Sequence, residues 1–117
     1  MTPFGQKLRK LRREQGVTQH RMALDLGISP AYLSALEHGW RGRPSWALVQ
    51  AIIGYFNIIW DEAEDLQDLA RLSHPRIAID TSGLDPEATE LVNRLARDIA
   101  HMTPEKINRL LKIVREK

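Results

Sequence analysis

The side chains that could do chemistry in this chain of 117 residues are hydrogen-bond donors, not nucleophiles or metal ligands. There is no cysteine, and the four histidines (His20, His38, His74 and His101) lack the spacing of metal ligands. The carboxylates of residues 61–65 lack the glycine-bearing loop of a calcium site. We find no phosphate-binding glycine loop and no nucleophile with a partner set. The sequence therefore predicts no enzyme activity, no metal site and no cofactor.

Basic donors gather in the first half of the chain. Residues 1–60 carry eight Lys/Arg and three Asp/Glu, a net charge of +5, whereas residues 61–117 carry nine and twelve, a net charge of −3. Arg41 and Arg43 lie in a loop rich in Gly and Pro, and Gln19 opens a helical pattern. Guanidinium and amide groups commonly contact phosphate oxygens. An ordinary solvated surface has a similar composition, so charge alone favours a nucleic-acid partner only slightly.

Two short helical patterns that meet at a glycine would position these donors. The first covers about residues 18–26 and the second about residues 29–38, with Gly27 as the left-handed residue between them. Ser29 and Pro30 are typical of a helix cap and first turn. The apolar positions of both patterns fall on one inward face: Met22, Ala23, Leu26, Leu33 and Leu36. The outward face of the second helix then consists of short side chains, which suits close entry into a major groove.

The stretch from Leu8 to Pro44 resembles the helix-turn-helix regulators of the lambda-type phage repressor and xenobiotic-response-element (XRE) family. The residues that carry the resemblance are Arg12, Thr18, Gln19, Gly27, Leu33, Ser34, Glu37 and Gly39. With the flanking helices the resemblance covers about residues 3–70. It implies an all-α fold built on a five-helix, lambda-repressor-like DNA-binding domain.

The domain organisation follows from the remaining patterns. We expect the DNA-binding domain over residues 1–73, a linker over residues 74–84 and two further helices over residues 85–117. Within the linker, residues 76–80 read as a short β-strand, with Ile77 and Ile79 on one side.

The resemblance also implies roles for individual residues. Contacts to the DNA phosphates fall at the start of the second helix and around the loop after the third: Thr18, Gln19, His38, Arg41 and Arg43. Base edges are read from the third helix: Ser29, Pro30, Ala31, Tyr32, Ser34 and Ala35. Because proline and alanine cannot make bidentate hydrogen bonds to bases, we expect thymine methyl contacts and DNA shape to carry much of the specificity.

Two further assignments concern packing. Arg12 and Glu37 match a family pair that forms a partly buried ion pair, and Glu37 falls on the apolar side of its helix, where a charge needs a partner. Trp40 is expected to pack on the edge of the core, with contact to the sugar–phosphate backbone as the alternative. Trp46 and Trp60 are expected in the core or in an interface, because a single-strand stacking platform needs several aromatic residues on one basic face.

Residues 85–117 carry two amphipathic patterns that are too small to form a core alone. We expect them to dimerise the protein, because regulators of this family read two half-sites about 34 Å apart. The expected interface residues are Ile77, Ile79, Leu91, Leu95, Ile99, Leu110 and Val114. Packing of these helices within the chain is the alternative.

These features predict a homodimeric, prokaryotic or phage-borne transcriptional regulator that binds a double-stranded DNA operator. Repression is the default mode, and activation through contact with RNA polymerase or another protein stays open. The alternative function is that of an antitoxin, whose C-terminal helices bind a partner protein while the N-terminal domain autoregulates. The lack of a signal peptide, of an apolar run of roughly 20 residues and of cysteine predicts a cytoplasmic, nucleoid-associated protein with no membrane partner.

Overall fold

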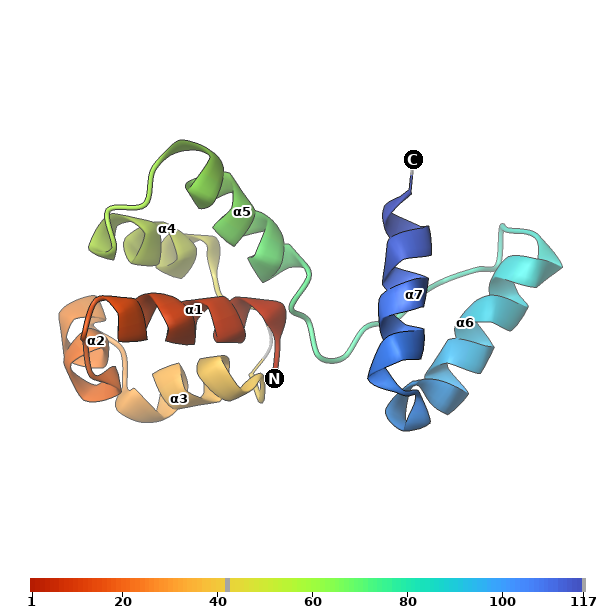
Figure 1. The fold of residues 1–117 in the computed structure, drawn as a ribbon, viewed down its shortest axis with the longest axis horizontal. Helices are drawn as coiled ribbons and strands as arrows, with labels where there is room; N and C mark the ends of the chain where they lie inside the picture. Colours follow the sequence, from red (N-terminus) through yellow and green to blue (C-terminus); the bar gives the residue numbers. More distant parts are fainter. Residues whose placement is uncertain (42, 117) are drawn as a thin grey trace. The chain divides into compact units, whose positions relative to one another are not determined.

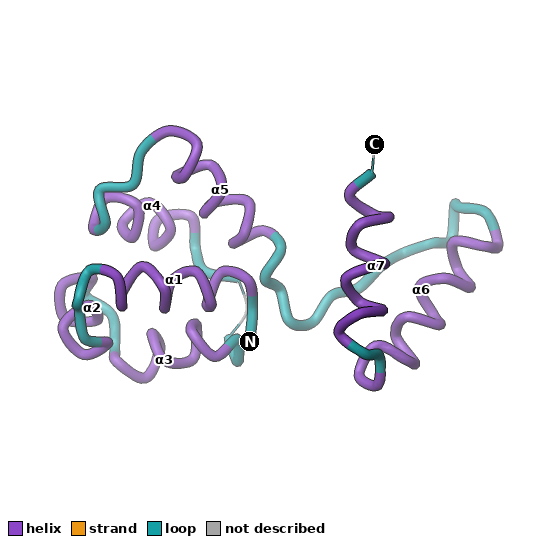
Figure 2. The backbone as a smooth tube through the Cα atoms, viewed as in Figure 1, coloured by secondary structure: helices purple, strands orange, loops and turns teal. Residues whose placement is uncertain are grey.

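The computed structural model describes residues 1–41 and 43–116, and every regular element among them is a helix (Figures 1 and 2). The elements are α1 (Pro3–Glu14), α2 (Gln19–Leu26), α3 (Pro30–His38), α4 (Trp46–Tyr55), α5 (Trp60–Arg71), α6 (Pro86–Asp98), the 3₁₀ turn η1 (Ile99–His101) and α7 (Pro104–Arg115). The predicted all-α fold is confirmed. The chain divides into two compact units, unit 1 from Met1 to Ile77 and unit 2 from Ala78 onwards.

Local capping explains where the helices begin. In α1, α2, α3, α4 and α7, the hydroxyl of the residue before the helix accepts a hydrogen bond from a backbone N–H of the first turn. The capping residues are Thr2, Thr18, Ser29, Ser45 and Thr103. Each bond satisfies an N–H that the helix itself leaves unpaired. These short-range bonds explain why the sequence predicted the helix starts to within a residue or two.

The core of unit 1 forms around α1. Figure 1 shows α1 crossing the middle of the unit, and it packs against both α3 and α5. Phe4 and Leu8 of α1 are at most 1% exposed and belong to one cluster with buried side chains from the other four helices. Those side chains include Met22, Ala23, Leu33, Val49, Ile52, Leu66 and Ala70. This single apolar cluster holds α2 and α3 in a fixed mutual orientation.

Two small residues, Gly5 and Ser73, bring α1 close to its neighbours. A Cβ added at Gly5 would collide with the backbone carbonyl oxygen of Leu36 and lie 2.7 Å from that of Glu37, so α1 and α3 are in backbone contact here. Ser73, which is buried just beyond α5, accepts a hydrogen bond of 2.8 Å from the backbone N–H of Phe4. The start of α1 is therefore fixed against both α3 and α5.

Tyr55 links α4 to α2. Its hydroxyl donates a hydrogen bond of 2.7 Å to Oδ2 of Asp25, and the other oxygen of Asp25 pairs with Arg21 at 3.3 Å. The pKa of Tyr55 is raised, mainly because the phenol is partly buried and also because it is hydrogen-bonded to the Asp25 carboxylate. The far end of α2 is thus held in place by a polar contact as well as by apolar packing.

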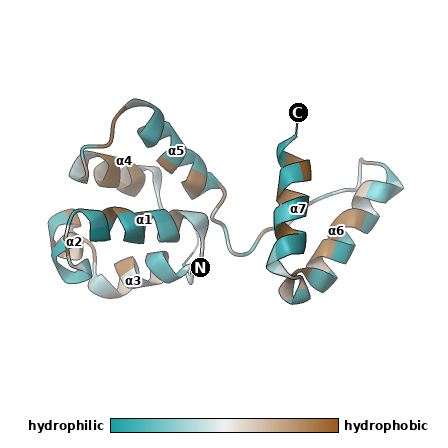
Figure 3. Cartoon of the chain, viewed as in Figure 1, coloured by the Kyte–Doolittle hydropathy of each residue, from teal (hydrophilic) through white to brown (hydrophobic). Residues whose placement is uncertain are grey.

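Unit 2 has no core. None of residues 78–116 is buried, and Leu91, Ile99 and Val114 are 55%, 54% and 79% exposed. Figure 3 shows apolar residues interspersed with polar ones along α6 and α7, and Figure 1 shows the two helices diverging from η1. The apolar faces of the two helices are therefore only partly covered inside the unit: Val92, Leu95, Ile107 and Leu110 are half-buried.

Residues 76–80, a possible strand by their pattern, form no strand within this chain, because a strand needs a second strand to pair its backbone groups and no described segment supplies one. For Trp46 and Trp60 the structure excludes the core, since they are 62% and 82% exposed, and a place in an interface stays a prediction. The apolar positions of α4 and α5 that do face inward, such as Val49, Ile52 and Leu66, already fill that space.

No helix that the structure describes is long and apolar enough to cross a membrane.

Candidate nucleic-acid interface

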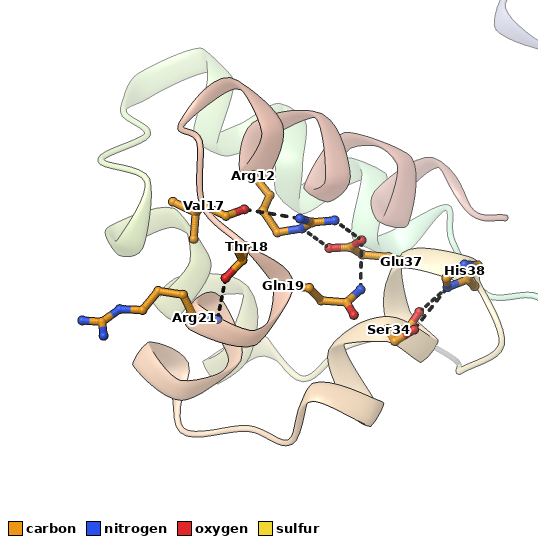
Figure 4. Close-up of polar contacts among 8 residues, drawn as sticks. All are labelled: Arg12, Val17, Thr18, Gln19, Arg21, Ser34, Glu37 and His38. Atoms are coloured by element: carbon orange, nitrogen blue, oxygen red, sulfur yellow. Dashed lines mark hydrogen bonds and ion pairs between the residues drawn. The ribbon is translucent and has the colours of Figure 1, made fainter.

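A buried ion pair joins α1 to α3, and a further bond ties it to the segment just before α2 (Figure 4). The guanidinium of Arg12 donates two hydrogen bonds to the carboxylate of Glu37, from Nε at 2.8 Å and from Nη2 at 3.0 Å. Its Nη1 donates to the backbone carbonyl of Val17 at 3.3 Å. Glu37 is 1% exposed, so its charge depends on this fork-shaped partner. The pair fixes the end of α3 against α1 and against the start of α2.

Gln19, the first residue of α2, joins the same network. Its Nε2 donates to Oε1 of Glu37 at 3.3 Å (Figure 4). An amide NH₂ group carries two hydrogens, and this bond uses one of them. Next to it, the hydroxyl oxygen of Thr18 accepts from the backbone N–H of Arg21 at 3.1 Å, which leaves the hydroxyl hydrogen of Thr18 to donate elsewhere. The start of α2 therefore presents one amide hydrogen and one hydroxyl hydrogen in a fixed position.

The outward face of α3 carries mostly short side chains, few of which are polar. Ser29, Pro30 and Ala31 are exposed, and Tyr32, Ser34 and Ala35 are half-buried. In the same helix Leu33, Leu36 and Glu37 are buried, so the six residues predicted to read bases share the face that is turned away from the core. The Ser29 oxygen accepts from the N–H of Tyr32 at 3.0 Å, which leaves its hydroxyl hydrogen free to donate.

His38 closes α3 with a local hydrogen bond. Its Nδ1 lies 2.8 Å from the backbone carbonyl oxygen of Ser34 and 3.4 Å from the Ser34 hydroxyl (Figure 4). Since a carbonyl oxygen only accepts, Nδ1 carries the hydrogen in this contact. Nε2 of a neutral ring is then an acceptor, and it donates to a phosphate only when the ring is protonated.

The loop after α3 turns outward and carries an exposed indole. Gly39 adopts a left-handed conformation with φ of 77°, and the backbone N–H of Trp40 donates to the carbonyl of Ala35 at 2.9 Å. Trp40 is 74% exposed and stacks on His38, with 4.7 Å between ring centroids and 19° between ring planes.

The expectation that Trp40 packs on the core edge is therefore wrong. A Cβ added at Gly39 would lie 2.8 Å from the backbone nitrogen of Thr2, so the N-terminal residues pack directly against the residue before Trp40.

The other predicted site residues divide between the two units. Arg41 and Arg43 are exposed and close to the end of α3 in sequence. The predicted interface residues of the C-terminal region lie at exposed or half-buried positions: Ile77, Ile79, Leu91, Leu95, Ile99, Leu110 and Val114.

Sequence reasoning missed the close approach at Gly5 and the Ser73 bond. A glycine inside a helix costs about 1 kcal/mol relative to alanine, which is the signal that could have marked Gly5.

A helix, a glycine turn and a second helix braced by α1 define a helix-turn-helix domain, and a family model described as a helix-turn-helix domain matches residues 3–66. The chain belongs to this helix-turn-helix family. A relative from Bacillus subtilis (strain 168), named uncharacterized HTH-type transcriptional regulator RghRB, is 38% identical over 61 residues, which are 52% of this chain and 44% of the relative. The chain thus spans less than half the length of that relative. No solved structure matches the chain.

Proposed function

We propose that this protein is a sequence-specific regulator of transcription that binds duplex DNA through α3 in the major groove. The observation that carries the proposal is the geometry of α2 and α3: Glu37 of α3 bonds both Arg12 of α1 and Gln19 of α2, and apart from Tyr32 the opposite face of α3 carries only small side chains. An α-helix with short outward side chains can approach base edges closely. The similarity to a protein named as an HTH-type transcriptional regulator supports the same function.

Phosphate contacts would hold α3 in the groove. Gln19 has an amide hydrogen left after its bond to Glu37, and Thr18 retains a hydroxyl hydrogen. In the loop after α3, Arg41 and Arg43 are exposed and follow His38 in sequence. These donors would position the helix, while base contacts from Ser29, Tyr32 and Ser34 and apolar contacts from Pro30, Ala31 and Ala35 would supply specificity.

We further propose that the protein acts as a homodimer held by unit 2. The apolar faces of α6 and α7 are only partly covered within that unit, and a second copy would bury exposed residues such as Leu91, Ile99 and Val114. Two copies of α3 would then read a palindromic operator. Binding over a promoter would exclude RNA polymerase, which makes repression the simplest outcome.

The same partly covered faces also fit a partner protein, as in an antitoxin. Sedimentation of the purified chain separates the two proposals: a dimer at micromolar concentration supports self-association, and a monomer favours a different partner.

The proposed docking face is tested with the double variant Gln19→Ala/Arg43→Ala. We first select operators from random duplex DNA and then measure affinity over a range of salt concentrations. The variant should bind every duplex more weakly, and the slope of log affinity against log salt should fall by roughly one, because Arg43 is the charged member of the replaced pair. The matched control Gln15→Ala/Arg76→Ala removes the same groups at exposed positions outside this face and should leave the slope unchanged. Native affinity and slope in the Gln19/Arg43 variant would exclude this docking face.

A further inference from the structure

We propose that Trp40 is an additional DNA-contacting residue, whose indole lies against the deoxyribose of the backbone strand beside α3. The inference rests on the proposed binding of duplex DNA and adds an apolar contact to it. Trp40 is 74% exposed and directly precedes Arg41 in the loop proposed to contact phosphates. An exposed aromatic ring at that place would make apolar contact with the sugar carbon atoms, whereas the arginines would bind the charged phosphates.

The position of Trp40 relative to α3 is fixed by its backbone. Its N–H is bonded to the carbonyl of Ala35, inside α3, at 2.9 Å. Gly39, the residue before it, is wedged against Thr2 at the start of α1. Since both the backbone bond and the wedge involve rigid helices, binding DNA would order little additional chain at this point.

The orientation of the indole is also constrained. One face of the ring stacks on His38 at a centroid distance of 4.7 Å, and His38 is itself anchored to the carbonyl of Ser34 at 2.8 Å. The stacked pair therefore stands at the C-terminal end of α3, with the second indole face open. Stacking on His38 reduces the rotamer freedom that Trp40 would lose on contact with a ligand.

Exposure alone does not single out Trp40, since Trp46 and Trp60 are 62% and 82% exposed. What distinguishes Trp40 is its attachment to α3 and its place beside Arg41. Trp46 begins α4 and Trp60 begins α5, and neither has a stacked aromatic partner among the described residues. These two tryptophans are therefore matched controls of the same residue type.

The test compares the affinity of full-length Trp40→Ala, Trp46→Ala and Trp60→Ala for a selected duplex at several salt concentrations. Trp40→Ala should weaken binding by about tenfold, the scale of one aromatic contact to a nucleotide. The slope against salt should stay native, because an indole releases no counterions. Arg41→Gln should instead lower the slope by roughly one. Trp46→Ala and Trp60→Ala should stay within about twofold of the native chain, and Trp40→Phe should retain most of the affinity.

A second measurement reports the contact directly. In the Trp46→Phe/Trp60→Phe chain, Trp40 is the one remaining tryptophan, and its emission should shift on addition of the duplex. Native affinity in Trp40→Ala, or a fall in its salt slope like that of Arg41→Gln, would overturn the proposal while leaving DNA binding intact. If the native chain binds no duplex, the proposed function fails and this inference fails with it. Thermal unfolding of each variant checks that the fold is kept.

Discussion

At the scale of single residues, the buried carboxylate of Glu37 organises the site. It accepts two hydrogen bonds from Arg12 and a third from Gln19, and so couples a structural ion pair to a proposed phosphate contact. Arg12 retains 15% side-chain exposure, whereas Glu37 retains 1%. The pair is therefore a partly desolvated one, whose loss leaves a charge with little water to stabilise it.

Replacing Glu37 by Gln should lower the free energy of unfolding by about 2 kcal/mol, because the Arg12 charge loses its counter-charge in a site with little solvent. Chemical denaturation measures the difference. The control is Glu14→Gln, which breaks the 3.9 Å pair between Lys10 and Glu14, whose side chains are 65% and 57% exposed. It should change stability by no more than about 0.5 kcal/mol. Equal effects of the two variants would show that the buried pair contributes no more than a surface pair.

At the scale of elements, the close approach of α1 and α3 sets the geometry of the site. The missing side chain of Gly5 lets α1 touch the backbone of Leu36 and Glu37. The same approach brings Arg12, farther along α1, within hydrogen-bond distance of Glu37. Helix contacts through a glycine are short because no Cβ separates the two backbones.

Alanine at Gly5 and at Gly54 should have opposite effects on stability. Both glycines lie inside helices, where alanine is favoured by about 1 kcal/mol. No atom outside its own helix lies within 4 Å of a Cβ added at Gly54, so Gly54→Ala should raise the free energy of unfolding. Gly5→Ala should lower it by about 2 kcal/mol, since α1 and α3 must separate. Thermal unfolding of both variants gives the comparison, and a stabilised Gly5→Ala protein would contradict the close packing described for α1 and α3.

At the scale of the whole molecule, the chain combines a unit with a core and a unit without one. Unit 1 buries an apolar cluster from five helices, whereas residues 78–116 bury no side chain. In the proposed homodimer, association with a second copy would supply free energy that stabilises unit 2.

A chain ending at Ile77 should stay folded but become monomeric. It keeps the whole core and the Ser73 bond, yet loses the proposed dimer contacts except Ile77. Its affinity for one half-site should be native, whereas its affinity for a palindromic operator should fall by about 100-fold because the two sites are no longer linked. Sedimentation and duplex titration check both statements.

In the full chain, Leu91→Asp should reproduce the loss of dimer, and Asn93→Asp, two residues further along α6, is the control of equal charge. If the chain ending at Ile77 were still a dimer, the interface would have to lie in unit 1, and the proposed role of unit 2 would be wrong.

The sequence by itself determined the elements that short-range forces create. Caps such as Thr18 and Ser29, together with the left-handed Gly27, define α2, the turn and α3 through bonds that span a few residues. The motif and its charge then predicted the family and the exposed face of α3.

Tertiary structure decided the features that depend on neighbours far away in the chain. The backbone contact at Gly5 and the bond from Phe4 to Ser73 join residues that no local pattern relates. Trp40 is exposed, and the N-terminal residues pack against Gly39, the residue before it. The expected strand at 76–80 is absent because pairing requires a second strand, which periodicity alone cannot supply. Propensity acts along the chain, whereas steric exclusion and pairing act between segments that only the fold brings together.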